Sequence, residues 1–313
     1  MTTKRSIGAL QFSAFAFLLC ALCASSPLLS ALNSSLPKRP EIYCTALVRL
    51  RVTDLEVSRK FYASILGLPQ GNQGCFDPQG AAVCFFINPQ QQVELVSGAT
   101  SEEGMKTLGF RVNDVSSMRK YLVAKGLKCG DVTSSNSGDD VLEIRDPENH
   151  RILFLSHEGG IAGSLSLSPI SSHLIHAGFV VRDRAAEDRL YKDVLGFHVY
   201  WHGGMKDDET NWVDMQVPDG TDWLEYMLNV PPNASHKTLG VMNHIALGVS
   251  DIHAAQQQLL KNGWKGTEQP KIGRDGKWQL NLYDPDDTRV ELMEFTPVEK
   301  PCCSEYTGPH PKP

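Results

Sequence analysis

Residues 54–68 read DLEVSRKFYASILGL, and residues 183–197 read DRAAEDRLYKDVLGF. Their aspartate, tyrosine and glycine recur in register 129 residues apart, as Asp54 and Asp183, Tyr62 and Tyr191, and Gly67 and Gly196. A second pair of stretches behaves in the same way: DVSSMRKYLVAKG begins at Asp114, and DIHAAQQQLLKNG begins at Asp251. Matches at such fixed offsets indicate a chain built from a repeated structural unit.

Each unit has the same predicted order of elements. An apolar run rich in β-branched residues precedes each aspartate, which predicts a strand; the runs are Leu47–Val52, Leu108–Val112, Ile175–Val181 and Ile245–Val249. Aspartate is a favourable N-cap, and the glycine that ends each stretch is a helix stop signal. Further strand-like runs complete each unit, so the sequence predicts the order β-α-β-β-β four times.

The repeats and the composition divide the chain into segments. A stretch rich in glycine and serine (GGIAGSLSLSPISS, residues 159–172) separates the second unit from the third and is typical of a linker. We expect a signal peptide at 1–25, a linker at 26–40, an N-terminal domain at 41–157, a linker at 158–170, a C-terminal domain at 171–297 and a Pro-rich tail at 298–313. We expect the tail to be loosely ordered.

The N-terminus has the composition of an export signal. Lys4 and Arg5 precede an apolar stretch of about 16 residues, which is short for a bilayer span, and small residues follow it. We expect a secreted or periplasmic protein with no stable membrane insertion after cleavage, or a membrane-anchored one if the signal is retained. An exported chain can form disulfides, but we expect the adjacent Cys302 and Cys303 not to bond each other.

Composition narrows the classes of partner. The 313 residues carry a net charge of −6 and no basic run, which disfavours nucleic acid and anionic membrane surfaces as partners. A small molecule is the expected partner, and the sequence leaves the oligomeric state open.

The repeated D-x11-LGL/LGF start and the ending DPDDTRVELM, from Asp284, carry a family resemblance. Over residues 43–297 the chain resembles the vicinal oxygen chelate superfamily, which includes glyoxalase I, extradiol dioxygenases, and fosfomycin- and bleomycin-resistance proteins. The resemblance implies an α+β fold of two tandem domains. In such a fold, four βαβββ modules form curved mixed sheets around a cup, with a divalent metal at its floor.

Four residues of the C-terminal half are candidate metal ligands. His176 and His244 each lie seven residues before the aspartate that starts a helix, so they occupy equivalent positions on equivalent strands. Glu225 and Glu291 follow them by 49 and 47 residues, on later strands. A lone strand histidine is usually structural, but two histidines and two glutamates at matched positions favour a site for one divalent ion, such as Zn, Ni, Co, Fe or Mn.

The N-terminal half offers an internal comparison. Leu47, Thr107 and Leu153 stand where His176, His244 and Glu291 stand in the other half, and only Glu94 approximately matches Glu225. The fold therefore does not itself require histidine at these positions. We expect the N-terminal domain to be metal-free, with a structural or lid role.

Three functions remain open. The set of two histidines and two glutamates resembles that of glyoxalase I, which implies a metal-dependent lyase or isomerase that forms an enediolate, with Glu225 or Glu291 as the catalytic base. Alternatively, His176, His244 and Glu291 would hold Fe(II) in an extradiol ring-cleavage dioxygenase. A third possibility is a binding protein of the bleomycin-resistance type, with an apolar guest held by tryptophans near the cup: Trp201, Trp212, Trp223 and Trp278.

Overall fold

The computed structural model describes residues 37–71, 75, 82–98, 105–135, 138–157, 168 and 170–313. Residues 37–313 form one compact unit. The expected signal peptide and most of both expected linkers lie outside the described residues. Among the described helices, none combines the length and the apolar character that a membrane crossing would need.

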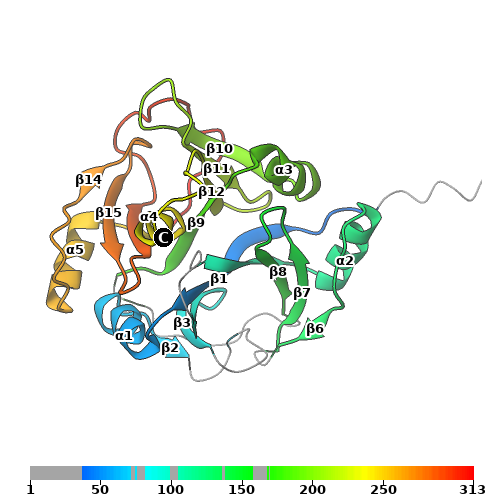
Figure 1. The fold of residues 1–313 in the computed structure, drawn as a ribbon, viewed down its shortest axis with the longest axis horizontal. Coiled ribbons are helices and arrows are strands. Elements are labelled where there is room, and N and C mark those ends of the chain that lie inside the picture. Colours follow the sequence, from blue (N-terminus) through cyan, green and yellow to red (C-terminus); the bar gives the residue numbers. More distant parts are fainter. Residues whose placement is uncertain are drawn as a thin grey trace, which may run out of the picture. The chain divides into compact units, whose positions relative to one another are not determined.

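The first two units form one curved, eight-stranded mixed sheet (Figure 1). Its strand order is β2-β3-β4-β1-β5-β8-β7-β6. The strands are β1 (Ile42–Val52), β2 (Gln70–Gly71), β3 (Val83–Asn88), β4 (Gln91–Ser97), β5 (Met105–Val112), β6 (Thr133–Ser134), β7 (Asp140–Arg145) and β8 (Arg151–Ser156). The central strands β1 and β5 run antiparallel, and each pairs in parallel with the last strand of its own unit.

The last two units form a second sheet with the same topology, in the order β10-β11-β12-β9-β13-β16-β15-β14. Its strands are β9 (His173–Val180), β10 (His198–Gly203), β11 (Trp212–Gln216), β12 (Trp223–Met227), β13 (His244–Val249), β14 (Lys271–Ile272), β15 (Trp278–Tyr283) and β16 (Arg289–Glu294). The predicted α+β fold of four βαβββ modules is therefore confirmed.

Four of the described helices start directly after the repeated aspartates, as the sequence predicts, whereas a further helix at His236–Met242 lies outside the repeat. The helices are α1 (Leu55–Lys60) continued by the π-helical turn η1 (Phe61–Ile65), α2 (Val115–Ala124), α3 (Arg184–Asp188) continued by η2 (Arg189–Val194), α4 (His236–Met242) and α5 (Ile252–Lys261). The four repeated aspartates accept hydrogen bonds from backbone N–H groups of the first turn. The glycines that end the helical stretches have positive φ, which a residue without Cβ adopts at least cost.

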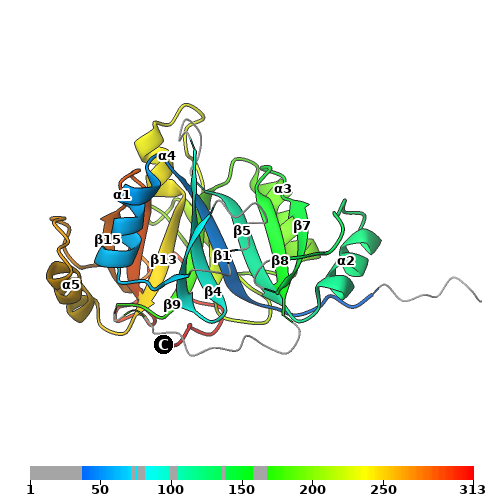
Figure 2. The same ribbon diagram turned by 90° about the horizontal axis from the view of Figure 1, so that it is seen from below.

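The repeated tyrosines connect the two halves. The hydroxyl of Tyr62, in η1, donates to Asp284 at the end of the second sheet, at 3.1 Å. The hydroxyl of Tyr191, in η2, donates to Asp146 at the end of the first sheet, at 3.3 Å. Figure 2 shows α1 lying beside β15, although the two elements belong to different halves. Each half therefore uses a helix of the other to cover the turn before its last strand.

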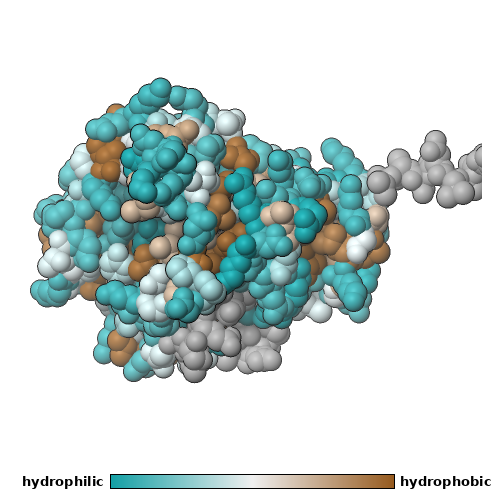
Figure 3. Space-filling model, turned by 45° about the horizontal axis from the view of Figure 1, so that its top comes forward, coloured by the Kyte–Doolittle hydropathy of each residue, from teal (hydrophilic) through white to brown (hydrophobic). Residues whose placement is uncertain are grey.

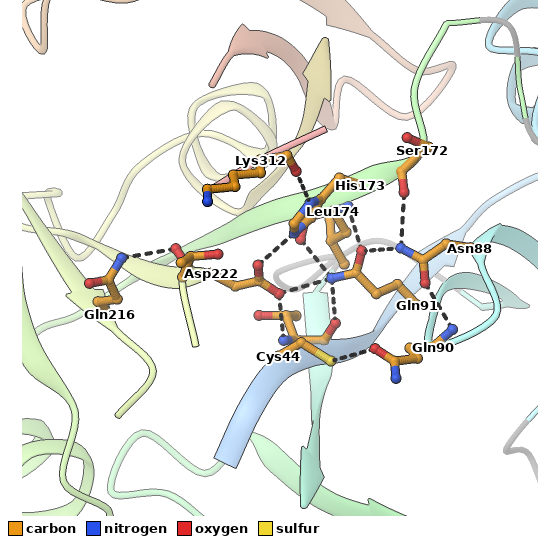
Figure 4. A network of polar contacts seen from close by, with 12 residues as sticks. Cys44, Asn88, Gln90, Gln91, Ser172, His173, Leu174, Gln216, Asp222 and Lys312 are labelled. Carbon is orange, nitrogen blue, oxygen red and sulfur yellow. Dashed lines mark hydrogen bonds and ion pairs between the residues drawn. The ribbon is translucent and has the colours of Figure 1, made fainter. Parts of the chain in front are cut away.

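A buried polar network also joins the halves (Figure 4). Asp222 accepts hydrogen bonds from the backbone N–H of Thr45 and the side chain of Gln91, both at 2.9 Å. It also contacts His173 Nε2 at 2.7 Å, and His173 Nδ1 lies 2.9 Å from the carbonyl oxygen of Lys312. Because a carbonyl can only accept, His173 donates from Nδ1 and ties the C-terminal end of the chain to this network.

Hydrophobic side chains from both sheets form one large core cluster, which includes Phe110 and Phe154 of the first half and Phe179 and Phe197 of the second. The rings of Phe110 and Phe197 meet edge to face at 5.3 Å. Figure 3 shows one face of the molecule, where hydrophilic residues cover most of the described surface and hydrophobic residues emerge in small groups. The two sheets thus share apolar packing as well as polar contacts.

Two expectations about the C-terminal segment are wrong. Residues 298–313 are not loosely ordered, because Cys302, Tyr306 and Thr307 all hydrogen-bond to the C-terminal half. Cys302 and Cys303 form a disulfide despite being adjacent, and a second disulfide joins Cys75 to Cys84. Composition did not predict an ordered segment, because the contacts that order it are made to residues far away in sequence.

Candidate metal centre

The sheet register brings the predicted ligands together in two rows that cross the centre of the second sheet. In the first row, Gly178 on β9 pairs with Glu225 on β12 and with His244 on β13. In the second row, Ala246 on β13 pairs with His176 on β9 and with Glu291 on β16. Laterally paired residues project from the same face of a sheet, so all four polar side chains point into the concave side.

The four side chains converge closely. The Nε2 atoms of His176 and His244 lie 3.0 Å apart. The Oε2 atom of Glu225 lies 3.0 Å from His244 Nε2 and 3.9 Å from His176 Nε2. The Oε2 atom of Glu291 lies 3.7 Å and 3.8 Å from the same two nitrogens. All four residues that the sequence singled out therefore face one point.

Backbone contacts set the orientation of His244. Its Nδ1 lies 3.0 Å from the carbonyl oxygen of Met242, which can only accept, so Nδ1 carries the proton and Nε2 presents a lone pair to the cluster. The ring lies against Gly178, where a Cβ atom would come within 1.9 Å of His244 Cε1. A glycine at this position is therefore a packing requirement of the histidine.

Burial shifts the pKa values of the histidines and of Glu291 in opposite directions. Burial lowers the pKa of His176 well below its usual range, and it also lowers the pKa of His244, so both imidazoles are neutral. Burial raises the pKa of Glu291 to about 7. Burial also opposes ionisation of Glu225, but the contact with His244 and the charge of Arg289 outweigh it and lower the pKa of Glu225 to about 2.

This donor set fits a divalent metal ion. His176, His244 and Glu225 each offer one ligand atom, and these atoms lie within 4.8 Å of one another. Two nitrogens bound to one ion at about 2.1 Å each lie roughly 3 Å apart, as the two Nε2 atoms do here. The two glutamates supply the negative charge that would neutralise such an ion.

His176, Glu225 and Glu291 line a cavity of about 350 Å³, and His244 is fully buried beside them. Trp201, Trp212 and Trp223 line its apolar side, and the Trp223 ring packs on His176 at 4.9 Å between centroids. Trp278, expected near the cup, instead packs on His253 of α5. Its strand neighbours Gln279 and Asn281 line the cavity, so strand alternation turns Trp278 to the opposite face.

A larger cavity, of about 700 Å³, lies against the first sheet. Its lining includes Leu127, Leu153 and the ion pair between Arg151 and Glu143. In the part of the chain that the structure describes, no group of potential metal ligands lies there. Size therefore does not identify the reactive cavity, and we place the candidate site in the smaller one.

The sequence profile of the Glyoxalase/Bleomycin resistance protein/Dioxygenase superfamily matches residues 45–154 and 173–292. The chain belongs to this superfamily. The match covers both halves and both sheets, as the tandem repeat predicted. No curated protein matches the sequence.

Solved structures of this superfamily's fold include two 2,3-dioxygenases. The 2,3-dioxygenase LapB from Pseudomonas sp. KL28 is 18% identical, with a TM-score of 0.62 over 88% of this chain and 96% of that one. A histidine-to-glutamate variant of homoprotocatechuate 2,3-dioxygenase from B. fuscum, in complex with HPCA, is 22% identical, with a TM-score of 0.61 over 82% of this chain and 72% of that one. At these identities the likeness shows the fold.

Sequence reasoning missed two cations at the site. Arg289 lies beside the cluster, with NH2 2.6 Å from His244 Nε2. Lys277 is fully buried behind Trp223, with Nζ 4.4 Å from that ring and close to the rings of Tyr200 and Tyr306. Strand alternation from Glu291 places Arg289 on the cup face, so the signal for this residue was present. The cage around Lys277 depends on Tyr306, which no local pattern connects to β15.

Proposed function

We propose that this protein is a metal-dependent enzyme that cleaves a catechol-type ring with molecular oxygen, in the manner of an extradiol dioxygenase. The observation that carries the proposal is the convergence of His176, His244 and Glu291, with Glu225 beside them, next to a cavity. Two histidines and one carboxylate that leave open positions are the donor set of non-haem Fe(II) oxygenases.

These residues would hold the ion, and the cavity walls would hold the substrate. When bound, Fe(II) would supply a Lewis acid for two adjacent substrate oxygens and a site for O₂. The neutral imidazoles keep their lone pairs available for it. The tryptophans of the wall fit a flat ring, and their apolar surface would exclude water from it.

The two-domain layout also supports this proposal. The candidate site lies in the C-terminal half, and the alignment with the 2,3-dioxygenase LapB extends over 96% of that chain. A single-domain neighbour would leave half of this protein without a counterpart.

Glu225 favours a second candidate, an enediolate-forming lyase or isomerase of the glyoxalase I type. It brings a second carboxylate to within 3.0 Å of His244 Nε2, which gives one more negative charge than a two-histidine, one-carboxylate iron site holds. A carboxylate that can leave the ion is suited to move a proton on a bound substrate.

Metal identification and substrate turnover separate the two candidates. Protein purified without chelators is analysed for metals, then loaded with Fe(II) without oxygen and supplied with catechols and O₂, with an oxygen electrode as the readout. In parallel, Zn-, Ni- and Co-loaded protein is offered a 2-oxoaldehyde. Oxygen uptake with ring cleavage supports the dioxygenase, and aldehyde turnover without oxygen supports the lyase. Metal-loaded protein that does neither contradicts both.

The Glu225→Gln variant sharpens this comparison. An iron dioxygenase that uses His176, His244 and Glu291 retains its metal and measurable oxygen uptake in this variant. A lyase in which Glu225 transfers the proton loses turnover while it still binds the ion. His253→Ala, which removes an exposed histidine of α5, is the matched control and leaves metal content and turnover unchanged.

We further propose that the mature protein acts outside the cytoplasm. The signal-like N-terminus predicts export, and the pairs Cys75–Cys84 and Cys302–Cys303 suit an oxidising compartment. N-terminal sequencing of protein from the outer fractions of the native cell tests this. A mature chain that begins at Met1 in the cytosolic fraction would contradict it.

A further inference from the structure

Arg289 lies in the candidate site, and among the described residues it hydrogen-bonds to a histidine, while its two carboxylate neighbours lie further away. Its NH2 group lies 2.6 Å from His244 Nε2, 3.7 Å from Glu225 Oε2 and 4.0 Å from Glu291 Oε2. Its Nε atom is buried and has no hydrogen-bond partner within the described residues. The side chain lines the cavity. The guanidinium thus contacts ligand atoms of the site while part of its donor capacity is unused.

In the N-terminal half, the equivalent arginine forms an ion pair with a glutamate on the neighbouring strand. Arg151 occupies the equivalent place on β8, and its Nε and NH2 atoms donate to the two oxygens of Glu143 at 3.0 Å and 2.7 Å. Glu143 pairs with Leu153, and Asn281 pairs with Glu291, so Asn281 stands where Glu143 would stand. The C-terminal half therefore keeps the arginine and replaces its acidic partner with a neutral amide.

Metal binding would free the guanidinium further. The Nε2 lone pair of His244 cannot both accept a hydrogen bond from Arg289 and bind an ion. An ion in the cluster therefore leaves the NH2 group of Arg289 without its shortest contact. The NH2 group then has N–H donors free beside the ligands, at the cavity that Arg289 lines.

We propose that Arg289 binds an anionic oxygen of the substrate. This inference rests on the proposed function and names the class of substrate: a molecule that presents a negatively charged oxygen next to the ion. Guanidinium groups bind such oxygens through two parallel hydrogen bonds. Glu225 and Glu291 alone would repel an anion, and the charge of Arg289 beside them counters that repulsion.

The anionic oxygen has two possible sources. It is either an ionised hydroxyl of the ring itself or a carboxylate substituent on the ring. The two sources share their recognition chemistry, and a pair of probes distinguishes them: catechol, which has only the two hydroxyls, and 3,4-dihydroxybenzoate, which adds a carboxylate.

The test measures probe binding rather than turnover. Wild type, Arg289→Gln and Arg289→Lys are loaded with Fe(II) under anaerobic conditions, and their metal content is measured in the same samples. Quenching of tryptophan fluorescence then gives the dissociation constant for each probe, since three tryptophans line the cavity. Arg151→Gln is the matched control, because it removes the equivalent arginine from the other half.

We expect Arg289→Gln to keep its metal and to bind the probes about tenfold more weakly or worse, with partial rescue in Arg289→Lys and no change in Arg151→Gln. Weakening for both probes assigns the ring oxygen, and weakening for 3,4-dihydroxybenzoate alone assigns the carboxylate. Equal affinities in wild type and Arg289→Gln overturn the inference, as does loss of metal from Arg289→Gln or a metal-loaded wild type that binds neither probe. A wild type that takes up no metal overturns the proposed function as well.

Discussion

At the scale of single residues, a few positions separate the half that carries the candidate metal site from the half whose described residues form none. Arg49 stands at the position of Gly178, and it donates to Glu94 at 2.7 Å inside the first sheet. Gly178 instead leaves the space that the ring of His244 fills. The same fold thus carries a buried ion pair in one half and a cluster of metal-type ligands in the other.

Substituting Gly178 by alanine should damage the site and spare the fold. The added Cβ would overlap the His244 ring, which must turn away from its ligand position. Because misplacing a ligand typically costs metal affinity by about tenfold or more, we expect a drop of that size in a metal titration of Gly178→Ala. Gly130→Ala is the control, since its Cβ meets nothing closer than 3.9 Å. Unchanged affinity in Gly178→Ala would show that His244 is not a ligand.

The ligand candidates could be read from the sequence because the repeat fixes their register. Two histidines at equal distances before two repeated aspartates had to lie on neighbouring central strands. Arg289 was not recognised as a candidate site residue. Its lack of an acidic partner depends on Asn281, which lies on a different strand and stands where Glu143 stands in the other half. Sequence periodicity places a side chain on a face, but it does not show which partner is missing there.

At the scale of elements, the C-terminal segment completes the wall behind the site. The Tyr306 hydroxyl donates to the carbonyl oxygen of Asp275 at 2.7 Å, and its ring lies 5.1 Å from Lys277 Nζ. Trp201, which lines the cavity, donates from its indole nitrogen to the carbonyl oxygen of Cys302. The segment therefore contacts Lys277, which lies behind the cavity wall, and Trp201, which lines the cavity.

Tyr306 should contribute to stability mainly through its ring. We expect Tyr306→Ala to lower the free energy of unfolding by about 2 kcal/mol, because the half-buried ring and its contact with the Lys277 ammonium are both lost. Tyr306→Phe keeps the ring and loses one hydrogen bond, so its cost should be about 1 kcal/mol. Urea denaturation of the three proteins measures both values. Equal stability of Tyr306→Ala and wild type would mean that the segment does not hold the wall.

The order of elements was predictable, whereas the course of the tail was not. Capping aspartates and terminating glycines are local signals, so α1 through α5 begin and end near the expected residues, apart from α4, which the repeat does not include. The tail has no such signals, because its proline content and its exposed residues suit a loose segment. Its order comes from individual contacts with β10 and with the turn at residues 274–277 that precedes β15.

At the scale of the whole described unit, the two halves exchange equivalent contacts. The backbone N–H of Thr53 donates to Asp286 in the second half, and the backbone N–H of Arg182 donates to Glu148 in the first. The tyrosine contacts follow the same exchange. The turns at the ends of each sheet are therefore held partly by residues of the other half.

This exchange predicts that the halves unfold together. We expect differential scanning calorimetry of the metal-free protein to show one transition, whose calorimetric and van't Hoff enthalpies agree. A Tyr62→Phe variant, which loses one contact between the halves, should shift that single transition to a lower temperature without splitting it. Two separated transitions in wild type would contradict a shared unit.

Glu187 gives the junction between the halves a pH dependence. It lies fully buried in α3, where burial and the neighbouring charge of Asp146 raise its pKa to about 8. The folded state therefore holds a proton that the unfolded state releases above its ordinary pKa, so this group makes the fold less stable as pH rises toward 8. The glutamine side chain of Glu187→Gln does not titrate, so the variant lacks this contribution to the pH dependence of stability.

We expect Glu187→Gln to become progressively more stable relative to wild type between pH 5 and pH 8, with a constant difference at higher pH. Thermal unfolding of the metal-free proteins across this range is the measurement. Glu299→Gln, at an exposed site, should follow the wild-type profile. A difference between Glu187→Gln and wild type that does not vary with pH would show that Glu187 is ionised in the folded state throughout.

The central claim is that the cluster formed by His176, His244, Glu225 and Glu291 binds one divalent ion. The most direct measurement is the metal-to-chain ratio, by mass spectrometry of elements, in protein purified without chelators and after reconstitution. We predict about one ion per chain for wild type and for His253→Ala, and almost none for a folded His244→Ala. Wild-type protein that takes up no metal, or a His244→Ala variant that retains it, would contradict the account.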